Sequence, residues 1–251
     1  MAYDFSGSNL SVNFETVPVT ATPLTIACWA ITSDTTNSQY LVSLSDGIAP
    51  PNHDGFFLNI GANVAGDPVR VFSVVNGTGA IAVTSTGITA NTWHHVCGVY
   101  ASDSSRTAYI DGGSAVEETT ASTPVGVAVG CFGGLRLNVV SNSLQGRICE
   151  VGIWNVALTA AEVLMLARGF SPQFVRPQSL VMYAPLIRTL QDIKAARAIT
   201  NNGAAVGAHR GIIYPAPPFY NEYTPAAVAA GPLLGGRLVK HGILQGRLVG
   251  A

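Results

Sequence analysis

The chain has 251 residues, of which 48% are hydrophobic and only 11% charged, whereas about a quarter of the residues of an ordinary soluble domain are charged. The mean hydropathy is +0.34, yet Gly, Pro, Asn or Ser interrupts each apolar run well short of the roughly 18 to 20 residues of a membrane-spanning helix, which excludes such a helix. The net charge is -1 and the basic residues are spread singly, so direct nucleic-acid binding and membrane binding are not expected.

The opening residues Met-Ala-Tyr-Asp-Phe have neither the basic stretch nor the apolar core of a signal peptide, so we expect no secretory signal and assembly in a cytoplasm. Beyond them, short apolar runs alternate with turn clusters at intervals of roughly ten residues, the pattern of an all-β protein. The expected strands are Leu10–Phe14, Leu24–Ile31, Tyr40–Leu44, Gly55–Ile60, Val69–Val75, Ile81–Ser85, Trp93–Tyr100, Thr107–Ile110, Val125–Phe132 and Leu144–Trp154.

One helix is predicted after these strands. Thr159-Ala160-Ala161-Glu162 forms a capping box, because the threonine hydroxyl can accept from the third helical amide while the glutamate reaches back to the threonine amide. Leu158 and Val163 stand at the hydrophobic staple positions, and Gly169 follows where a left-handed residue ends a helix. We therefore expect a helix from about residue 160 to 168.

The four cysteines are Cys28, Cys97, Cys131 and Cys149, and none forms a CxxC pair. Three of them lie within strand-like apolar runs, so we interpret all four as reduced core residues. A bridge between Cys131 and Cys149 is the alternative.

Two segments resemble a known family. NTWHHVCGVYASDSSRTAYIDGG is similar to the central hairpin of laminin G-like, concanavalin A-like jelly rolls, and LQGRICEVGIWNVALTAAEV is similar to their closing strand and capped helix. With the opening strands, the resemblance covers roughly residues 1–170. It implies a two-sheet antiparallel jelly-roll sandwich with one short helix, a fold that hosts lectins, hydrolases, adhesive modules and virion proteins.

Side-chain alternation divides the first of these segments between two faces of a strand. Trp93 and His95 share one face and His94 the other, so the two histidines cannot chelate one metal ion together, and we expect one in the core or an interface and one exposed. Asp111-Gly112 stands where a turn needs positive φ. The tryptophans lie in apolar runs and are expected in the core rather than as sugar-stacking platforms: Trp29, Trp93 and Trp154.

A catalytic site is not expected. Retaining glucanases need two carboxylates about 5 Å apart, but the candidate strand carries Glu150 alone, with Gly152 where the partner would stand. Glu117 and Glu118 are neighbours in what reads as a polar turn, so they face differently. Hydrolase, P-loop and dinucleotide fingerprints are also missing. We therefore predict no catalytic residues and no enzyme activity.

The loop SDGIAPPNHDG carries Asp46, Asn52, His53 and Asp54, whose oxygen and imidazole groups could line a calcium or sugar pocket. Its Pro and Gly content fits a rigid turn equally well, and a dense carboxylate string is missing, so we favour the turn. No metal-binding residue or cofactor is therefore predicted, with calcium as the alternative, and the carbohydrate-binding residues are left unassigned.

The last third of the chain differs in charge. Residues 1–170 contain 12 acidic residues and 5 arginines, whereas residues 171–251 contain 8 basic and 2 acidic residues. A strand expected over Leu180–Leu186 resembles the first strand of many laminin G-like domains and can pair with the sandwich edge. We therefore assign residues 1–214 to the sandwich, with a core at 1–170 and an edge segment at 171–214.

Residues 215–251 are rich in Pro, Gly and Ala, which forbids a regular helix or a central strand. A disordered end is one interpretation, although disordered tails are seldom this apolar. The other is an extended arm that docks on a partner. A tetrapeptide repeated ten residues apart supplies its expected partner-binding residues: Arg237, Leu238, Val239, Arg247, Leu248 and Val249.

Two function classes follow. The resemblance extends to laminin G-like proteins of tailed phages, which implies a structural virion protein, such as a capsid decoration or head or tail accessory protein. Its partners would be the major capsid protein and further copies of the chain, a trimer being a common arrangement. The alternative is a carbohydrate-binding adhesion module, with or without calcium.

Overall fold

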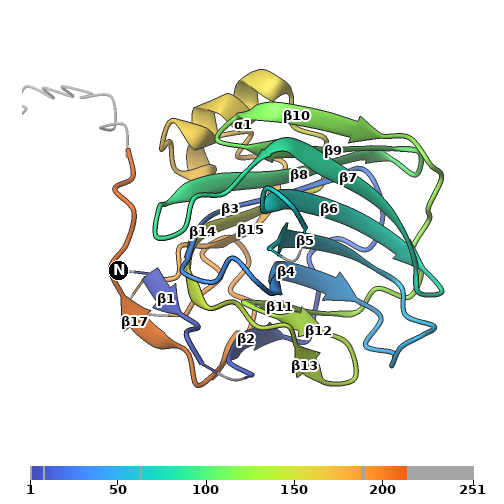
Figure 1. The fold of residues 1–251 in the computed structure, drawn as a ribbon, viewed down its shortest axis with the longest axis horizontal. Helices are drawn as coiled ribbons and strands as arrows, with labels where there is room; N and C mark the ends of the chain where they lie inside the picture. Colours follow the sequence, from blue (N-terminus) through green and yellow to red (C-terminus); the bar gives the residue numbers. More distant parts are fainter. Residues whose placement is uncertain (1, 8, 63, 188–189, 214–251) are drawn as a thin grey trace, which may run out of the picture. The chain divides into compact units, whose positions relative to one another are not determined.

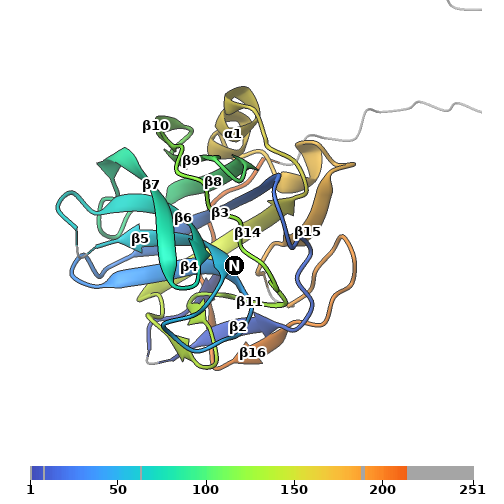
Figure 2. The ribbon, with the colours of Figure 1, turned by 90° about the vertical axis from the view of Figure 1, so that its right-hand side faces the viewer.

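The computed structural model describes residues 2–7, 9–62, 64–187 and 190–213. Two antiparallel sheets of eight and seven strands lie face to face, as Figures 1 and 2 show from two sides. The strands of the first sheet are β1 (Ala2–Asp4), β3 (Leu24–Thr32), β8 (His94–Ser102), β9 (Ser105–Ile110), β10 (Gly113–Glu118), β14 (Gly146–Trp154), β15 (Leu180–Ala184) and β17 (Ala205–Gly207). Those of the second sheet are β2 (Ser11–Phe14), β4 (Ser38–Ser45), β5 (Gly55–Gly61), β6 (Pro68–Val75), β7 (Thr78–Gly87), β11 (Val129–Phe132) and β16 (Thr200–Asn202).

The core between the sheets follows from side-chain alternation. Along β3, Leu24, Ile26 and Cys28 join the cluster between the sheets, while Ala27 and Trp29 belong to clusters on the outer face of the first sheet. The predicted all-β jelly-roll sandwich is therefore confirmed.

The outer face of the first sheet is covered by the helix α1 (Ala160–Ala167) and the short 3₁₀ helix η1 (Pro172–Phe174), with Trp154 buried beneath them. The capping box is present: Glu162 N–H donates to the Thr159 hydroxyl, and Thr159 N–H donates to the Glu162 carboxylate. Gly169 has a φ of 95°. The predicted helix and both of its ends are therefore confirmed.

Residues after 171 supply edges to both sheets. β15 pairs with β14, β16 pairs with β2, and β17 pairs with β1. The predicted arm at 215–251 and its expected partner-binding residues, Arg237, Leu238, Val239, Arg247, Leu248 and Val249, lie outside the described residues. The arm therefore stays a prediction.

The polar turn predicted at Glu117 and Glu118 is wrong. Both residues belong to β10, which pairs with β9 at the edge of the first sheet. Most of the side chains of β10 are exposed, so the strand lacks the apolar alternation that marks half-buried strands. Among the described residues, no helix is long and apolar enough to span a membrane.

All four cysteines are free and buried. Cys28 lies between the sheets and Cys97 beneath α1, while Cys131 contacts the Ser43 hydroxyl at 3.3 Å on the outer face of the second sheet. The expectation of reduced core cysteines is confirmed, and the alternative bridge between Cys131 and Cys149 is not formed. Burial raises the pKa of Cys131 to about 11 and that of Cys149 to about 12.

The native protein should therefore react very slowly with a thiol reagent such as DTNB, because the thiols are both inaccessible and protonated. Unfolding in guanidinium chloride without reductant should expose four reactive thiols, counted by absorbance. A count of two under these conditions would contradict the free state of the cysteines.

Candidate functional site

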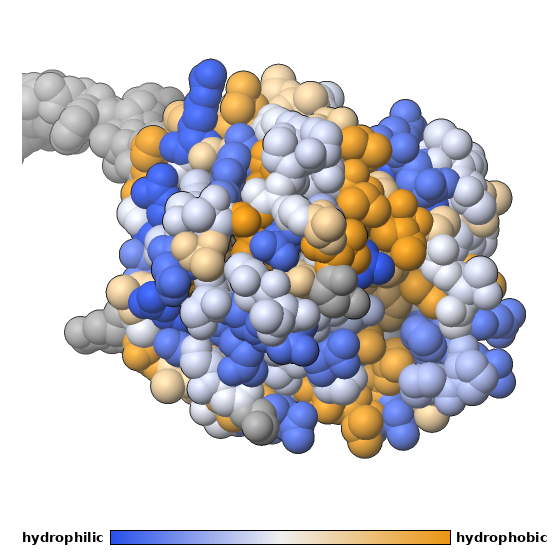
Figure 3. All heavy atoms as spheres, viewed as in Figure 1, coloured by the Kyte–Doolittle hydropathy of each residue, from blue (hydrophilic) through white to orange (hydrophobic). Residues whose placement is uncertain are grey.

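The outer face of the second sheet carries rings and unpaired polar groups in adjacent rows. Strand register aligns Tyr40 with Asn59 and Asn59 with Arg70, and in the next row it aligns Phe57 with Phe72. Figure 3 shows this face, on which hydrophobic side chains gather over β6 and β7 among polar ones. Residues from three separate strands are thus brought to one surface.

Three of these rings pack against one another. The centroids of Tyr40 and Phe57 are 5.8 Å apart with the rings nearly perpendicular, and Tyr40 stacks on Phe72 at 6.2 Å. His53 meets Phe57 edge-on at 6.2 Å. The rings border a depression of about 200 Å³, the aromatic pocket, lined by Tyr40, His53, Phe57, Phe72, Val74, Gly77, Gly79 and Ile81.

A small hairpin, β12 (Leu135–Arg136) and β13 (Val140–Ser141), lies against β4 and forms one side of this region. Arg136 N–H donates to the Ser43 hydroxyl at 3.0 Å, and the Ser45 hydroxyl donates to the Arg136 carbonyl. Leu137 from the same hairpin is buried against the aromatic cluster. The hairpin is therefore held against β4 beside the aromatic cluster.

The loop before β5 approaches from another side. The Asp46 carboxylate accepts from Asp54 N–H at 3.0 Å, and the Asp54 carboxylate accepts from the amides of Asn76 at 2.7 Å and Val125 at 2.9 Å. These carboxylates hold the loop itself, in agreement with the turn interpretation. His53 from this loop lines the pocket. Among the described residues, no group of three or more His, Cys, Asp or Glu side chains could hold a metal ion.

Several polar groups around the pocket have no partner within the described part of the chain. Neither His53 Nδ1 nor Asn59 Oδ1 has a hydrogen-bond partner, although both atoms are buried. Burial raises the pKa of Tyr40, and Arg70 opposes part of this rise, so the phenol stays protonated. The arrangement provides apolar ring faces together with hydrogen-bonding groups that a ligand can satisfy.

A bulge in β4 explains why the sequence pattern does not indicate this pocket. Regular alternation would place Tyr40 on the same face as Val42 and Leu44, which belong to the core between the sheets. The register shifts between Tyr40 and Val42, so Leu41 and Val42 both enter the core and Tyr40 turns outward. The composition of the segment does not signal the extra residue.

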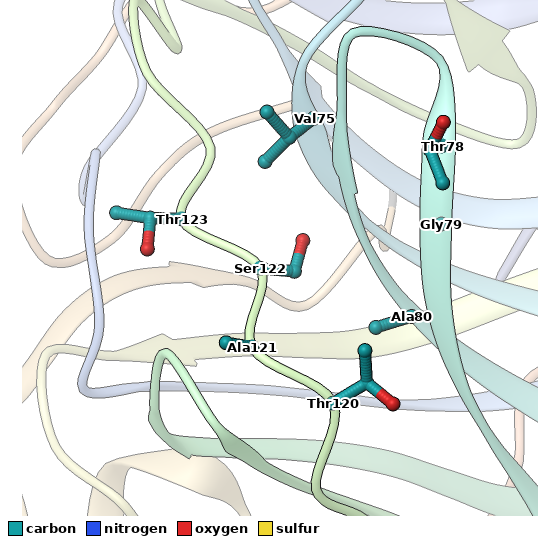
Figure 4. A pocket seen from close by; sticks show the side chains of 8 residues that line it. All are labelled: Val75, Thr78, Gly79, Ala80, Thr120, Ala121, Ser122 and Thr123. Atoms are coloured by element: carbon teal, nitrogen blue, oxygen red, sulfur yellow. The ribbon is translucent and has the colours of Figure 1, made fainter.

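A larger cleft of about 370 Å³ lies between the β6–β7 hairpin and residues 120–123, where Val75, Ala80 and Ser122 point into the gap (Figure 4). The Ser122 hydroxyl donates to the Ser73 carbonyl at 3.0 Å, so it is already satisfied. The lining contains neither a ring nor a charge: Val75, Thr78, Gly79, Ala80, Thr120, Ala121, Ser122 and Thr123. This cleft offers less specificity than the aromatic pocket.

Glu150 lies on the outer face of the first sheet, away from the aromatic pocket. It is 2% exposed and occupies a bulge in β14 with a φ of 55°. Tyr183 donates to its carboxylate at 2.6 Å, and His209 Nε2 lies 3.3 Å from it. A Cβ on Gly152 would come within 2.4 Å of the Trp154 ring, so the position that would hold a second carboxylate has no room for one.

The adjacent histidines point to opposite faces, as alternation predicts. The carboxylate of Asp111 lies 2.7 Å from His94 Nδ1 and accepts from His95 N–H at 2.9 Å. His95 is buried and meets Trp29 edge-on at 5.5 Å. His94 is held by Asp111 and its side chain is only 12% exposed, which corrects the expectation of an exposed histidine. Asp111 and Gly112 have φ values of 50° and 76°, as the predicted turn requires.

The tryptophans line the outer face of the first sheet rather than the pocket. Trp154 and Trp29 are buried, which confirms their expected core positions. Trp154 Nε1 donates to the Val175 carbonyl at 2.8 Å, and the Arg210 guanidinium lies 4.6 Å from the centre of the Trp29 ring. Trp93 is partly buried against the cluster of Ala2, Trp29 and Cys149.

The chain belongs to the concanavalin A-like lectin/glucanases superfamily, whose sequence profile matches residues 6–164. Among solved structures, it is similar to a native heptameric SAP-like pentraxin from Limulus polyphemus, with 15% identity over 82% of this chain and 94% of that one and a TM-score of 0.57. It is also similar to the CBM40 domain of the IT-sialidase of Ruminococcus gnavus, with 12% identity, 66% and 97% coverage and a TM-score of 0.54.

The same Ruminococcus gnavus domain bound to α2,3-sialyllactose gives a TM-score of 0.53 at 12% identity, with 66% of this chain and 97% of that domain covered. At such identities the likeness establishes the fold alone. A search of curated proteins finds no match. The lectin-like fold is therefore established, and none of these comparisons bears on a virion setting.

His95 should make stability depend on pH. Burial lowers its pKa to about 4, with Asp111 opposing part of the shift, so the unfolded chain, with an ordinary value near 6.5, binds a proton first as the pH falls. The stability that neutral His95 contributes is complete above about pH 6.5 and is lost toward about pH 4, by roughly 2–3 kcal/mol.

The measurement is urea unfolding at pH values of about 7 and about 4.5, for the wild type and for His95→Phe, which keeps a ring against Trp29 but does not titrate. The free energy of unfolding should fall more steeply for the wild type. Equal decreases in both proteins would contradict the assignment.

Proposed function

We propose that this protein is a non-catalytic carbohydrate-binding module that holds a sugar in the aromatic pocket. The observation that carries the proposal is the combination of three packed rings with the unpartnered buried atom Nδ1 of His53, which lines the pocket. An unsatisfied buried polar atom costs about 1–3 kcal/mol, and sugar hydroxyls are both donors and acceptors. A bound sugar would remove that cost.

The size of the pocket indicates a small ligand. Its volume of about 200 Å³ is below the roughly 300–1,000 Å³ of sites for drug-sized ligands, so we expect one terminal sugar unit inside and the rest of the glycan outside. The fold supports this function by analogy, since a domain with the same fold is known bound to α2,3-sialyllactose.

The absence of catalysis is part of the proposal. Glu150 is buried on the opposite face of the sandwich and held by Tyr183, and Gly152 leaves no space for a second carboxylate. A glycosidase mechanism that needs two carboxylates across a sugar therefore has no support here.

The structural virion role expected from the sequence gains no supporting observation. The arm residues Arg237 and Arg247, with their apolar neighbours, lie outside the described residues. The capsid partner, the trimer and the cytoplasmic assembly accordingly stay predictions, and the carbohydrate-binding alternative becomes the main proposal.

Filling the pocket tests the proposal without removing a contact. Gly79 lies on β7 between Phe72, Val74 and Ile81, and a Cβ there would meet them at ordinary contact distances of 3.4–3.6 Å. Gly79→Val should keep the fold, because β-branched residues suit strands, while its methyl groups occupy the pocket. We expect at least about a tenfold loss of affinity on a glycan array and by calorimetry.

Tyr40→Ala should weaken binding by a similar factor through loss of a ring face and a hydroxyl. Phe174→Ala is the matched control, because this ring is 42% exposed in η1 on the other side of the molecule. Circular dichroism checks that each variant is folded. An array on which the folded wild type binds no glycan, or folded pocket variants with unchanged affinity, would overturn the proposed function.

A further inference from the structure

Arg70 is the sole charged residue in β4, β5, β6 and β7. Its guanidinium carbon lies 4.7 Å from the centre of the Phe72 ring, which lines the aromatic pocket. A Cβ on Gly61 would stand 2.4 Å from Arg70 Cδ, so the side chain extends across the space that this glycine leaves open. The cation is therefore fixed beside the pocket by packing on both sides.

This arginine differs from the other buried or half-buried arginines that the structure describes in having no side-chain hydrogen bond, since even Arg106 and Arg147, which lack an ion pair, donate to backbone carbonyls. Arg136 pairs with Glu15 through two contacts of 2.7 Å, and Arg197 pairs with Asp192 at 2.8 Å. Within the described residues, Arg70 makes neither an ion pair nor a side-chain hydrogen bond, although it is half-buried. Its five N–H donors are thus available to a ligand.

The chemistry of a guanidinium narrows the ligand class. Its planar fork matches the two oxygens of a carboxylate or a sulfate, and such charge-assisted bonds are about twice as strong as neutral ones. Partial burial strengthens the attraction, because the effective dielectric constant is lower than in water. A neutral sugar could not form such charge-assisted hydrogen bonds with the guanidinium.

We propose that the aromatic pocket selects an acidic sugar, in which Arg70 pairs with a carboxylate or sulfate while the rings of Tyr40 and Phe72 contact the apolar face of the sugar. This inference rests on the proposed function and adds its ligand class. The ring nitrogen Nδ1 of His53, which lines the pocket, would then bond to a sugar hydroxyl.

The excess of acidic residues in residues 1–170 has only a weak effect on an acidic sugar bound close to Arg70. Residues 1–170 carry 12 acidic residues and 5 arginines, but interactions between exposed charges are screened beyond about 8–10 Å at ordinary salt. The four strands around the pocket contain no Asp or Glu. The Asp46 and Asp54 carboxylates lie in the loop that carries His53, where they accept backbone amides, so Arg70 is the one charge on the strands themselves.

The test is a glycan array built from matched pairs, followed by calorimetry on the pairs that bind. One set compares uronic-acid saccharides with their carboxyl-reduced forms, and a second compares sulfated saccharides with desulfated ones. We expect the full chain to bind the acidic member about tenfold or more tightly. The preference should decrease as salt is added.

Arg70→Gln should remove that preference, and Arg70→Lys should retain part of it. Arg168→Gln, which removes an exposed charge at the end of α1, is the control and should change neither affinity. Binding with equal affinity for both members and no effect of Arg70→Gln would overturn the acidic ligand class while the proposed function stands. No binding to any glycan would overturn both.

Discussion

Each strand at the centre of the second sheet contributes side chains to two apolar surfaces, because successive side chains point to opposite faces. In β5, Phe56 and Leu58 enter the core between the sheets, while Phe57 faces outward into the aromatic cluster. The backbone pairing that holds the core therefore also aligns Phe57 with Phe72. The position of the aromatic pocket therefore depends on the packing of the sandwich.

The low charge of the chain has a structural explanation. Turns are held by uncharged groups and by carboxylates that accept backbone amides, as Asp54 does from Asn76 and Val125. Arginines drawn toward the interior have hydrogen-bond acceptors, as Arg197 has in the Asp192 carboxylate and Arg106 has in the carbonyls of Thr120 and Asp103. Against this pattern, Arg70 is an exception, and exceptions of this kind are more informative about ligands than the exposed charges are.

Buried polar groups on the two outer faces of the sandwich have different surroundings. On the first sheet, Glu150 is enclosed by Tyr183 and His209, beneath segments that follow the jelly-roll core in sequence. On the second sheet, His53 retains an unpartnered atom and lines the aromatic pocket. His95 Nδ1 and His209 Nε2 on the first sheet also have no hydrogen-bond partner, so His53 is distinguished by lining a surface depression that a ligand can enter.

The sequence by itself determined the longer strands and the helix, because apolar alternation and the Thr159 capping box are local signals, but it did not reveal short or exposed edge strands such as β10, β16 and β17. It also placed His94 and His95 on opposite faces, which needs nothing beyond the period of a strand. The site was different. Tyr40, Asn59 and Arg70 meet only through strand pairing, and a one-residue bulge turns Tyr40 away from the core. Pairing and bulges are set by contacts between distant segments, so only the tertiary structure decided where the pocket lies.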